Sequence, residues 1–242
     1  MLAARRVRRL TGISIEDWRE LSGRFPELTP DPGRLAARHR ARLARLAARS
    51  LSSGRWAVEL DGDPPRAEPT VYVTAHIGSL QALRYCLRAR AVPAATLLGP
   101  FNLERSAAER QDRVFDRRHP IAFPHFFPAA TVHRLRTALR SGSLIAAADL
   151  PARVGIEEPL LGGRVRLDPR PFRLARAAGV ACRPAFVTLP GGRWTLTLGE
   201  RLPEDEDEAV RAFAGVYRGV ASAAPADLDG VVYLHLARGA RG

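Results

Sequence analysis

His76 is the residue of this sequence best placed to act as a general base. It directly follows the apolar run TVYVTA (residues 70–75), which is typical of a buried strand, and it precedes Ile77, Gly78 and a helix that begins after Ser79. In open parallel sheets, ligands gather beyond the carboxyl ends of the strands. A histidine at that edge, beside a glycine that frees the backbone, can take a proton from a bound substrate. The alternative is a histidine that only caps the turn.

The segment around His76 resembles the motif of a known enzyme family. VTAHIGSLQAL is similar to the strand–His–x4–Asp/Glu block of the lysophospholipid acyltransferase superfamily. It is most similar to the lipid A late acyltransferase (lauroyl/myristoyl transferase) branch, whose motif reads H-x-G-N-W-E. His76 and Gly78 match this motif, whereas Ser79, Leu80 and Gln81 stand where Asn, Trp and Glu would be.

A second block extends the resemblance over roughly residues 71–202. In that branch, a strand ends in Asp and is followed by a Gly-containing loop, a PFFG-like turn, a helix reading P-x-x-L-A-x-x-x-G and a strand with Pro. Here SLIAAAD ends at Asp149, and Gly155 and PLLGGR (159–164) come next. The remaining matches follow in the same order: Pro171, Leu174, Ala175, Gly179 and Pro184.

The resemblance implies transfer of an acyl chain from a thioester, acyl-CoA or acyl-carrier protein, to an acceptor hydroxyl, with an amine as the second-ranked acceptor group. His76 would take the hydroxyl proton while the oxygen attacks the thioester carbonyl, and the acid of the family motif would orient the imidazole. The resemblance implies no covalent enzyme intermediate, cofactor or metal. Because a thiolate is a good leaving group, positioning, base catalysis and oxyanion stabilisation suffice.

Gln81 departs from the family motif at the position of the acid. A glutamine oxygen can accept the imidazole N–H, but it carries no charge to stabilise the imidazolium. In the Ser-His-Asp triad, the corresponding change from acid to amide costs about 10⁴ in rate. Two explanations stay open: the chain is a degenerate member that binds acyl chains or lipid without turnover, or another carboxylate replaces the missing one.

Asp149 is the best substitute for the missing acid. It follows the strand predicted at residues 143–148, which should run parallel to the strand that ends at His76, so both side chains would emerge at one edge of the sheet. Glu157 and Glu158 are weaker candidates. The alternative is a loop aspartate that caps its own turn.

Several further residues are candidates for substrate binding. The helix expected over 104–117 corresponds to one whose arginines, in the family, face the phosphate or sugar of the acceptor, and Arg164 follows the PLLGG turn. The alternative for each arginine is a solvated surface position. With the two motif positions after His76, the predicted binding set is Gly78, Ser79, Arg105, Arg110, Arg113, Gly162, Gly163 and Arg164.

The aromatic segment, the remaining histidines and the cysteines give weaker indications of function. The aromatic segment FPHFFP (123–128) is predicted to be a loop that lines an acyl tunnel, dips into lipid or simply covers the core. His119, His125 and His133 are too loosely spaced to predict a metal site. Cys86 and Cys182 lie far apart in helical and strand patterns, as expected of inert core residues.

Alternating strands and helices must position these residues. Beyond the strand at 70–75 this rhythm predicts a mainly parallel, mixed sheet flanked by helices, an α/β fold. The expected helices cover residues 79–90, 104–117, 130–140, 171–178 and 204–222. The further expected strands cover residues 95–98, 121–123, 143–148, 164–167, 181–189, 193–199 and 231–236.

The composition is that of a globular protein with a strong positive charge. Arginine and lysine together number 38 against 25 acidic residues, giving a net charge of +13, and every one of the 38 is arginine. Such an excess favours an anionic partner. No apolar run has the roughly 18 residues of a membrane-spanning helix, and no secretory leader is evident.

Together these observations predict one acyltransferase-like domain over residues 1–242, with a basic helical region at 1–53 and the core at 70–202. The helix expected at 34–50 places arginines on one face, which suits either a solvated helix or contact with an anionic membrane. We therefore expect a cytoplasmic protein at the inner face of the cell membrane. Its partners would be an acyl thioester, an anionic membrane surface or lipid acceptor and, where the thioester is carried on a protein, an acyl-carrier protein. Nucleic acid is not expected, because no recognition motif is present.

Overall fold

A computed structural model gives the fold of the chain. It describes residues 58–65, 68–78, 80–88, 90–92, 94–98, 126–128, 132–149, 155–190 and 193–228, with residues 16, 19, 20, 23, 232 and 236. The four described residues near the start of the chain are helical, and they lie in the region at 1–53 that was expected to be helical. The helices expected at 34–50 and 104–117 lie outside the described residues.

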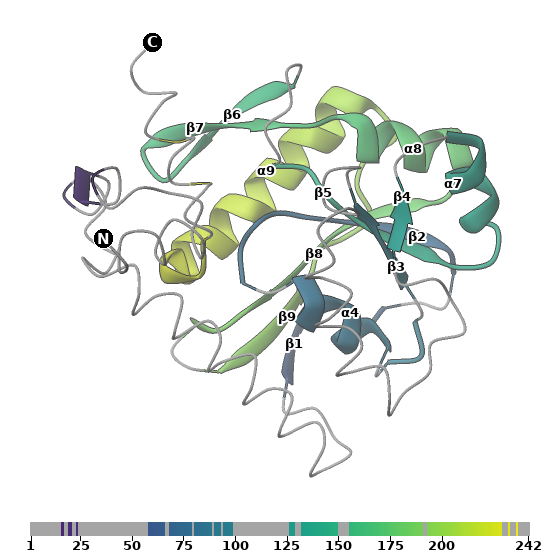
Figure 1. Cartoon of the computed structure of the whole chain (residues 1–242), viewed down its shortest axis with the longest axis horizontal. Coiled ribbons are helices and arrows are strands. Elements are labelled where there is room, and N and C mark those ends of the chain that lie inside the picture. Colours follow the sequence, from purple (N-terminus) through teal and green to yellow (C-terminus); the bar gives the residue numbers. More distant parts are fainter. Residues whose placement is uncertain are drawn as a thin grey trace.

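Seven strands form one mixed sheet (Figure 1). Their order is β1–β9–β8–β2–β5–β3–β4. Five of them, β2, β3, β4, β5 and β8, run in one direction, and β9 and β1 run in the other. Their bounds are β1 Val58–Gly62, β2 Thr70–Thr74, β3 Ala94–Leu98, β4 Phe126–Pro128, β5 Ser143–Ala147, β8 Ala181–Thr188 and β9 Trp194–Leu198. The predicted mainly parallel, mixed sheet is confirmed.

Helices cover both faces of this sheet (Figure 1). The helices whose bounds the structure describes are α4 (Leu80–Arg88), α7 (Val132–Ala138), α8 (Arg170–Ala178) and α9 (Glu206–Ala223), followed by the short 3-10 helix η2 (Pro225–Asp227). On β2, Val71 and Val73 face the core that α7, α8 and α9 cover, whereas Tyr72 faces the core under α4. This alternation follows from the two-residue period of a strand.

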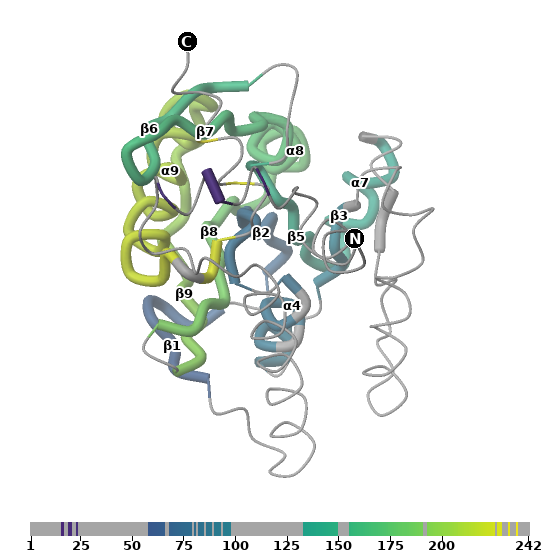
Figure 2. The backbone as a smooth tube through the Cα atoms, turned by 60° about the vertical axis from the view of Figure 1, so that its left-hand side comes forward, coloured from purple at the N-terminus to yellow at the C-terminus, as the bar shows by residue number. Residues whose placement is uncertain are grey.

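A separate hairpin packs beside α9 (Figure 2). It consists of β6 (Ile156–Leu160) and β7 (Gly163–Leu167), joined by a two-residue turn. Leu161 and Gly162 both have positive φ, 44° and 73°, which is the requirement of a type I′ turn. Sequence patterning predicted β7 but not β6, because Glu157, Glu158 and Pro159 are unusual strand residues.

One predicted strand and one predicted loop need correction. Val232 and Leu236, in the strand expected at 231–236, are helical and buried. The two residues are four positions apart, which places both on one side of a helix. The apolar run VVYLHL is therefore as compatible with a helix as with a strand. The segment 123–128 was expected to be a loop, but its last three residues form the strand β4 (Phe126–Pro128). The strand expected at 121–123 lies outside the described residues and stays a prediction.

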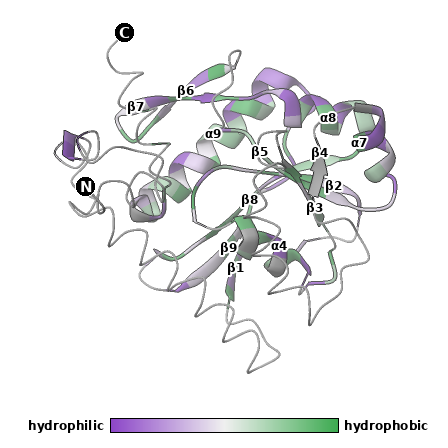
Figure 3. Cartoon of the chain, in the orientation of Figure 1, coloured by the Kyte–Doolittle hydropathy of each residue, from purple (hydrophilic) through white to green (hydrophobic). Residues whose placement is uncertain are grey.

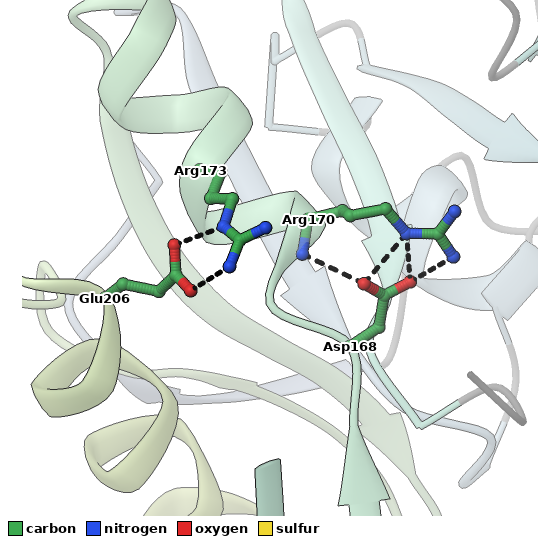
Figure 4. A network of polar contacts seen from close by, with 4 residues as sticks. All are labelled: Asp168, Arg170, Arg173 and Glu206. Carbon is green, nitrogen blue, oxygen red and sulfur yellow. Dashed lines mark hydrogen bonds and ion pairs between the residues drawn. The ribbon is translucent and has the colours of Figure 1, made fainter. Parts of the chain in front are cut away.

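The surface and the core separate by residue type (Figure 3). The central strands are mostly hydrophobic, and the outer sides of α8 and α9 carry hydrophilic residues. Two polar contacts tie α8 to its surroundings (Figure 4). Arg173 of α8 binds Glu206 of α9 through two hydrogen bonds, and the buried Asp168 binds both the main-chain N–H and the guanidinium of Arg170. None of the helices in the described part of the chain is long and apolar enough to cross a membrane.

Candidate active site

The turn after β2 is held in place at each of its residues. The N–H of Ile77 donates to the carbonyl oxygen of Ala75, and the N–H of Gly78 donates to that of Asp227, both at 2.8 Å. Gly78 has a φ of +66°, and a Cβ at this position would lie 1.9 Å from the carbonyl oxygen of Val187. The turn therefore requires glycine, which gives a structural reason for the Gly78 of the motif.

His76 and Asp149 lie at the same edge of the sheet because their strands are parallel neighbours. In the register of β2 and β5, Thr74 pairs with Ala147, and each candidate residue follows two positions later. The N–H of Ala148 extends the ladder by donating to the carbonyl oxygen of Thr74 at 2.9 Å. The expected placement of the two side chains at one edge is therefore present.

The two side chains are in direct contact. The Nδ1 of His76 lies 2.7 Å from Oδ1 of Asp149, and the main-chain N–H of His76 donates to Oδ2 at 2.7 Å. A loop aspartate that served only to cap its own turn would not make this pair of contacts. Because a carboxylate oxygen accepts hydrogen bonds, we assign the imidazole proton to Nδ1, which leaves the lone pair on Nε2.

Burial differs sharply between the partners. The side chain of Asp149 is fully buried, whereas 36% of the His76 side chain is exposed. The imidazole is thus accessible from outside, and the carboxylate behind it is shielded from water. In such surroundings a carboxylate depends on protein donors, and Asp149 has three in the His76 N–H, the His76 ring and the Tyr217 hydroxyl. This arrangement can orient an imidazole as a general base and stabilise its charged form.

Tyr217 and Asp227 are site residues that sequence reasoning missed. Tyr217 donates its hydroxyl hydrogen to Oδ2 of Asp149 at 3.1 Å, and the Asp227 carboxylate accepts from the N–H of Leu189 after β8. A signal for Tyr217 existed, since it belongs to the apolar stripe of α9 and a buried tyrosine hydroxyl usually finds a partner. We find no corresponding signal for Asp227.

The other candidates for the acid lie elsewhere. Gln81 is in the first turn of α4, and its side chain lies outside the described residues, as does Ser79. Glu157 is on the hairpin, where its carboxylate accepts a hydrogen bond from Arg166 at 2.6 Å. That hydrogen bond is the main reason why the pKa of Glu157 is lowered. Glu158 is its neighbour on the same strand. Among these carboxylates, Asp149 makes the contact to the His76 ring.

The predicted substrate-binding residues are only partly described. Gly162, Gly163 and Arg164 belong to the turn and second strand of the hairpin, and the Arg164 guanidinium pairs with Glu157 at 3.5 Å. Their role in binding stays a prediction. Three further candidates, Arg105, Arg110 and Arg113, lie outside the described residues.

The described part of the chain supports neither a metal site nor a reactive cysteine. It holds no group of three or more His, Cys, Asp or Glu residues that could bind a metal ion. His133 is exposed on α7, and His119 and His125 are outside the described residues. Cys86 and Cys182 are buried, and burial raises the pKa of each thiol to about 12, as expected of inert core residues.

Comparison with known proteins gives a structural likeness but no sequence match. No protein-family model matches the sequence, and no curated protein sequence matches it either. Among solved structures, the chain is similar to the 1-acyl-sn-glycerophosphate (LPA) acyltransferase PlsC from Thermotoga maritima. The two are 16% identical, the match covers 76% of this chain and 82% of that one, and the TM-score is 0.44.

Proposed function

We propose that this chain is an acyltransferase, which moves a fatty acyl chain from a thioester to a hydroxyl of a lipid or amphiphilic acceptor, with an amine as the second-ranked acceptor group. The observation that carries the proposal is the 2.7 Å contact between Nδ1 of the accessible His76 and Oδ1 of the fully buried Asp149. A histidine held in this way is suited to remove a proton from a weakly acidic hydroxyl. The motif resemblance around His76 supports the same class of reaction.

In the proposed reaction, Nε2 of His76 takes the proton of the acceptor hydroxyl as its oxygen forms a bond to the thioester carbonyl carbon. The resulting tetrahedral intermediate collapses when the carbon–sulfur bond breaks. The proton on Nε2 then passes to the departing thiolate, so the products are the acyl ester and a free thiol, and His76 returns to its starting state. No covalent acyl-enzyme and no cofactor are needed in this scheme.

Asp149 would supply the charge that Gln81 cannot. As His76 takes up the proton, the imidazolium lies against the fully buried Asp149 carboxylate, so water screens this charge pair less than it would screen a pair at the surface. The main-chain N–H groups of His76, Ile77 and Gly78 all have protein partners. The donors that stabilise the oxyanion must therefore come from elsewhere in the chain.

The donor would be acyl-CoA or acyl-carrier protein, and the acceptor would lie at an anionic membrane surface. The net charge of +13 supports this choice of surface, because arginine-rich proteins are attracted to anionic headgroups. We propose a peripheral position at the inner face of the cell membrane. In this position, Gly78, Ser79 and the arginines of the binding set would approach the substrates.

Release of free thiol tests the proposal. Long-chain acyl-CoA and acyl-carrier protein thioesters are offered in turn with vesicles containing lysolipid, and the native protein is compared with His76→Ala. His133→Ala is the matched control, because His133 is exposed on α7. We expect acceptor-dependent release that is lost in His76→Ala and kept in His133→Ala. Vesicle binding without release from any donor would overturn the proposal and favour the non-catalytic lipid-binding alternative.

A further inference from the structure

We propose that Tyr217 is a positioning residue, which fixes the Asp149 carboxylate so that Oδ1 faces the ring of His76. The inference rests on the acyl transfer proposed above and adds a third member to its site. Tyr217 belongs to α9, 68 residues beyond Asp149, and donates its hydroxyl hydrogen to Oδ2 of the carboxylate at 3.1 Å.

The ring of Tyr217 is held firmly by its neighbours. It is fully buried and stacks on Phe186 of β8, with ring centres 5.8 Å apart and ring planes 15° apart. Phe213, one turn earlier on α9, contacts both rings, at 6.0 Å from Tyr217 and 5.7 Å from Phe186. These contacts fix where the hydroxyl lies. The packing of α9 on the sheet therefore determines where the hydroxyl holds the carboxylate.

The division of donors between the two carboxylate oxygens gives Tyr217 its role. Oδ2 accepts from the main-chain N–H of His76 and from the Tyr217 hydroxyl, whereas Oδ1 faces the His76 ring. Two donors on Oδ2 resist rotation of the carboxylate about its Cβ–Cγ bond, and they compensate for the complete burial of the charge. Without the hydroxyl, the orientation of Oδ1 toward Nδ1 rests on one main-chain N–H.

Tyr217→Phe removes the hydroxyl and leaves the aromatic stack in place. Hydrogen bonds to charged groups are among the stronger ones in proteins, and a tenfold change in rate corresponds to about 1.4 kcal/mol. We therefore expect kcat to fall about tenfold or more. KM should stay unchanged, because the buried ring cannot reach a substrate. The matched control is Tyr72→Phe, since Tyr72 is equally buried but lies on the opposite face of β2 under α4.

A spectroscopic signature separates positioning from general loss of stability. In protein labelled with ¹⁵N-histidine, the resonance of the His76 Nδ1–H proton reports its hydrogen bond to Asp149. We expect this resonance to shift and broaden in Tyr217→Phe and to remain as in the native protein in Tyr72→Phe. An unchanged resonance in Tyr217→Phe, or the same change in both variants, would overturn the inference.

A double-mutant cycle completes the test. If Tyr217 acts through the carboxylate, Tyr217→Phe should have little further effect on kcat in the Asp149→Asn background, whereas independent effects would multiply. Multiplying effects would contradict the inference. Should the native protein release no thiol from any thioester, the acyl transfer proposal fails. The Nδ1–H resonance, which needs no substrate, then still decides whether Tyr217 positions the His76–Asp149 pair.

Discussion

Gly78, in the turn after β2, is hydrogen-bonded to Asp227, in the segment that follows α9. The main-chain N–H of Gly78 donates to the carbonyl oxygen of Asp227 at 2.8 Å, and the neighbouring Ile77 and Leu228 form an antiparallel bridge. The segment after α9 thus holds the turn that carries His76. Because Tyr217 contacts Asp149 from the same helix, α9 and the residues that follow it support both members of the His76–Asp149 pair.

Substitution of Gly78 should disturb this turn. A left-handed backbone costs a residue with a Cβ about 1–2 kcal/mol, and the Cβ would also overlap the carbonyl oxygen of Val187. We expect Gly78→Ala to lower the free energy of unfolding in urea by at least about 1–2 kcal/mol. Gly215→Ala is the control, because Gly215 is an exposed residue of α9 with open space around it. It should raise stability by up to about 1 kcal/mol. Equal effects of the two substitutions would contradict the role of the turn.

Replacement of the Asp149 carboxylate should abolish most turnover. In Asp149→Asn the amide carries no charge, and its NH₂ group competes for the position of the Nδ1 proton. By analogy with the Ser-His-Asp triad, we expect kcat in the thiol-release assay to fall by about 10³–10⁴. Glu157→Gln should leave kcat within about twofold, because Glu157 is exposed and its carboxylate binds Arg166. A fall of less than tenfold in Asp149→Asn would show that another group stabilises the imidazolium.

The sequence predicted those parts of the site that depend on local pattern and strand direction. Apolar runs marked β2 and β5, and parallel pairing of the two strands brings His76 and Asp149 together at their ends. The contact of Tyr217 with Asp149 was not predictable, because it depends on how α9 packs across the sheet. The strand β6 was missed for a local reason, since Glu157 and Pro159 have low strand propensity and only pairing with β7 makes this segment extended.

The cysteines should be unreactive in the folded protein. Burial raises the pKa of both thiols to about 12, so almost no thiolate exists at neutral pH. We expect Cys86 and Cys182 to react with a thiol reagent only after denaturation, and thiol release by the enzyme to survive treatment of the native protein. Rapid labelling of a cysteine together with loss of activity would indicate a cysteine nucleophile and contradict the direct transfer that we propose.

The ion pair between α8 and α9 should make stability depend on pH in one direction. The two hydrogen bonds from Arg173 lower the pKa of Glu206 below its ordinary value of 4.5. A carboxylate with a lowered pKa in the folded state stabilises the fold above its unfolded value, and this contribution is lost as the pH falls through the folded value. Because 58% of the Arg173 side chain is exposed, solvent screening limits the contribution to about 0.5–1 kcal/mol. In urea unfolding, Glu206→Gln should therefore be less stable than the native protein by that amount at pH 7, and the difference should shrink below about pH 4.5.

The control is Glu204→Gln, because the Glu204 carboxylate is 81% exposed and lies 3.4 Å from Arg201. This variant should show almost no difference from the native protein at either pH. A Glu206→Gln deficit that persisted in acid would mean that packing, and not charge, joins the two helices.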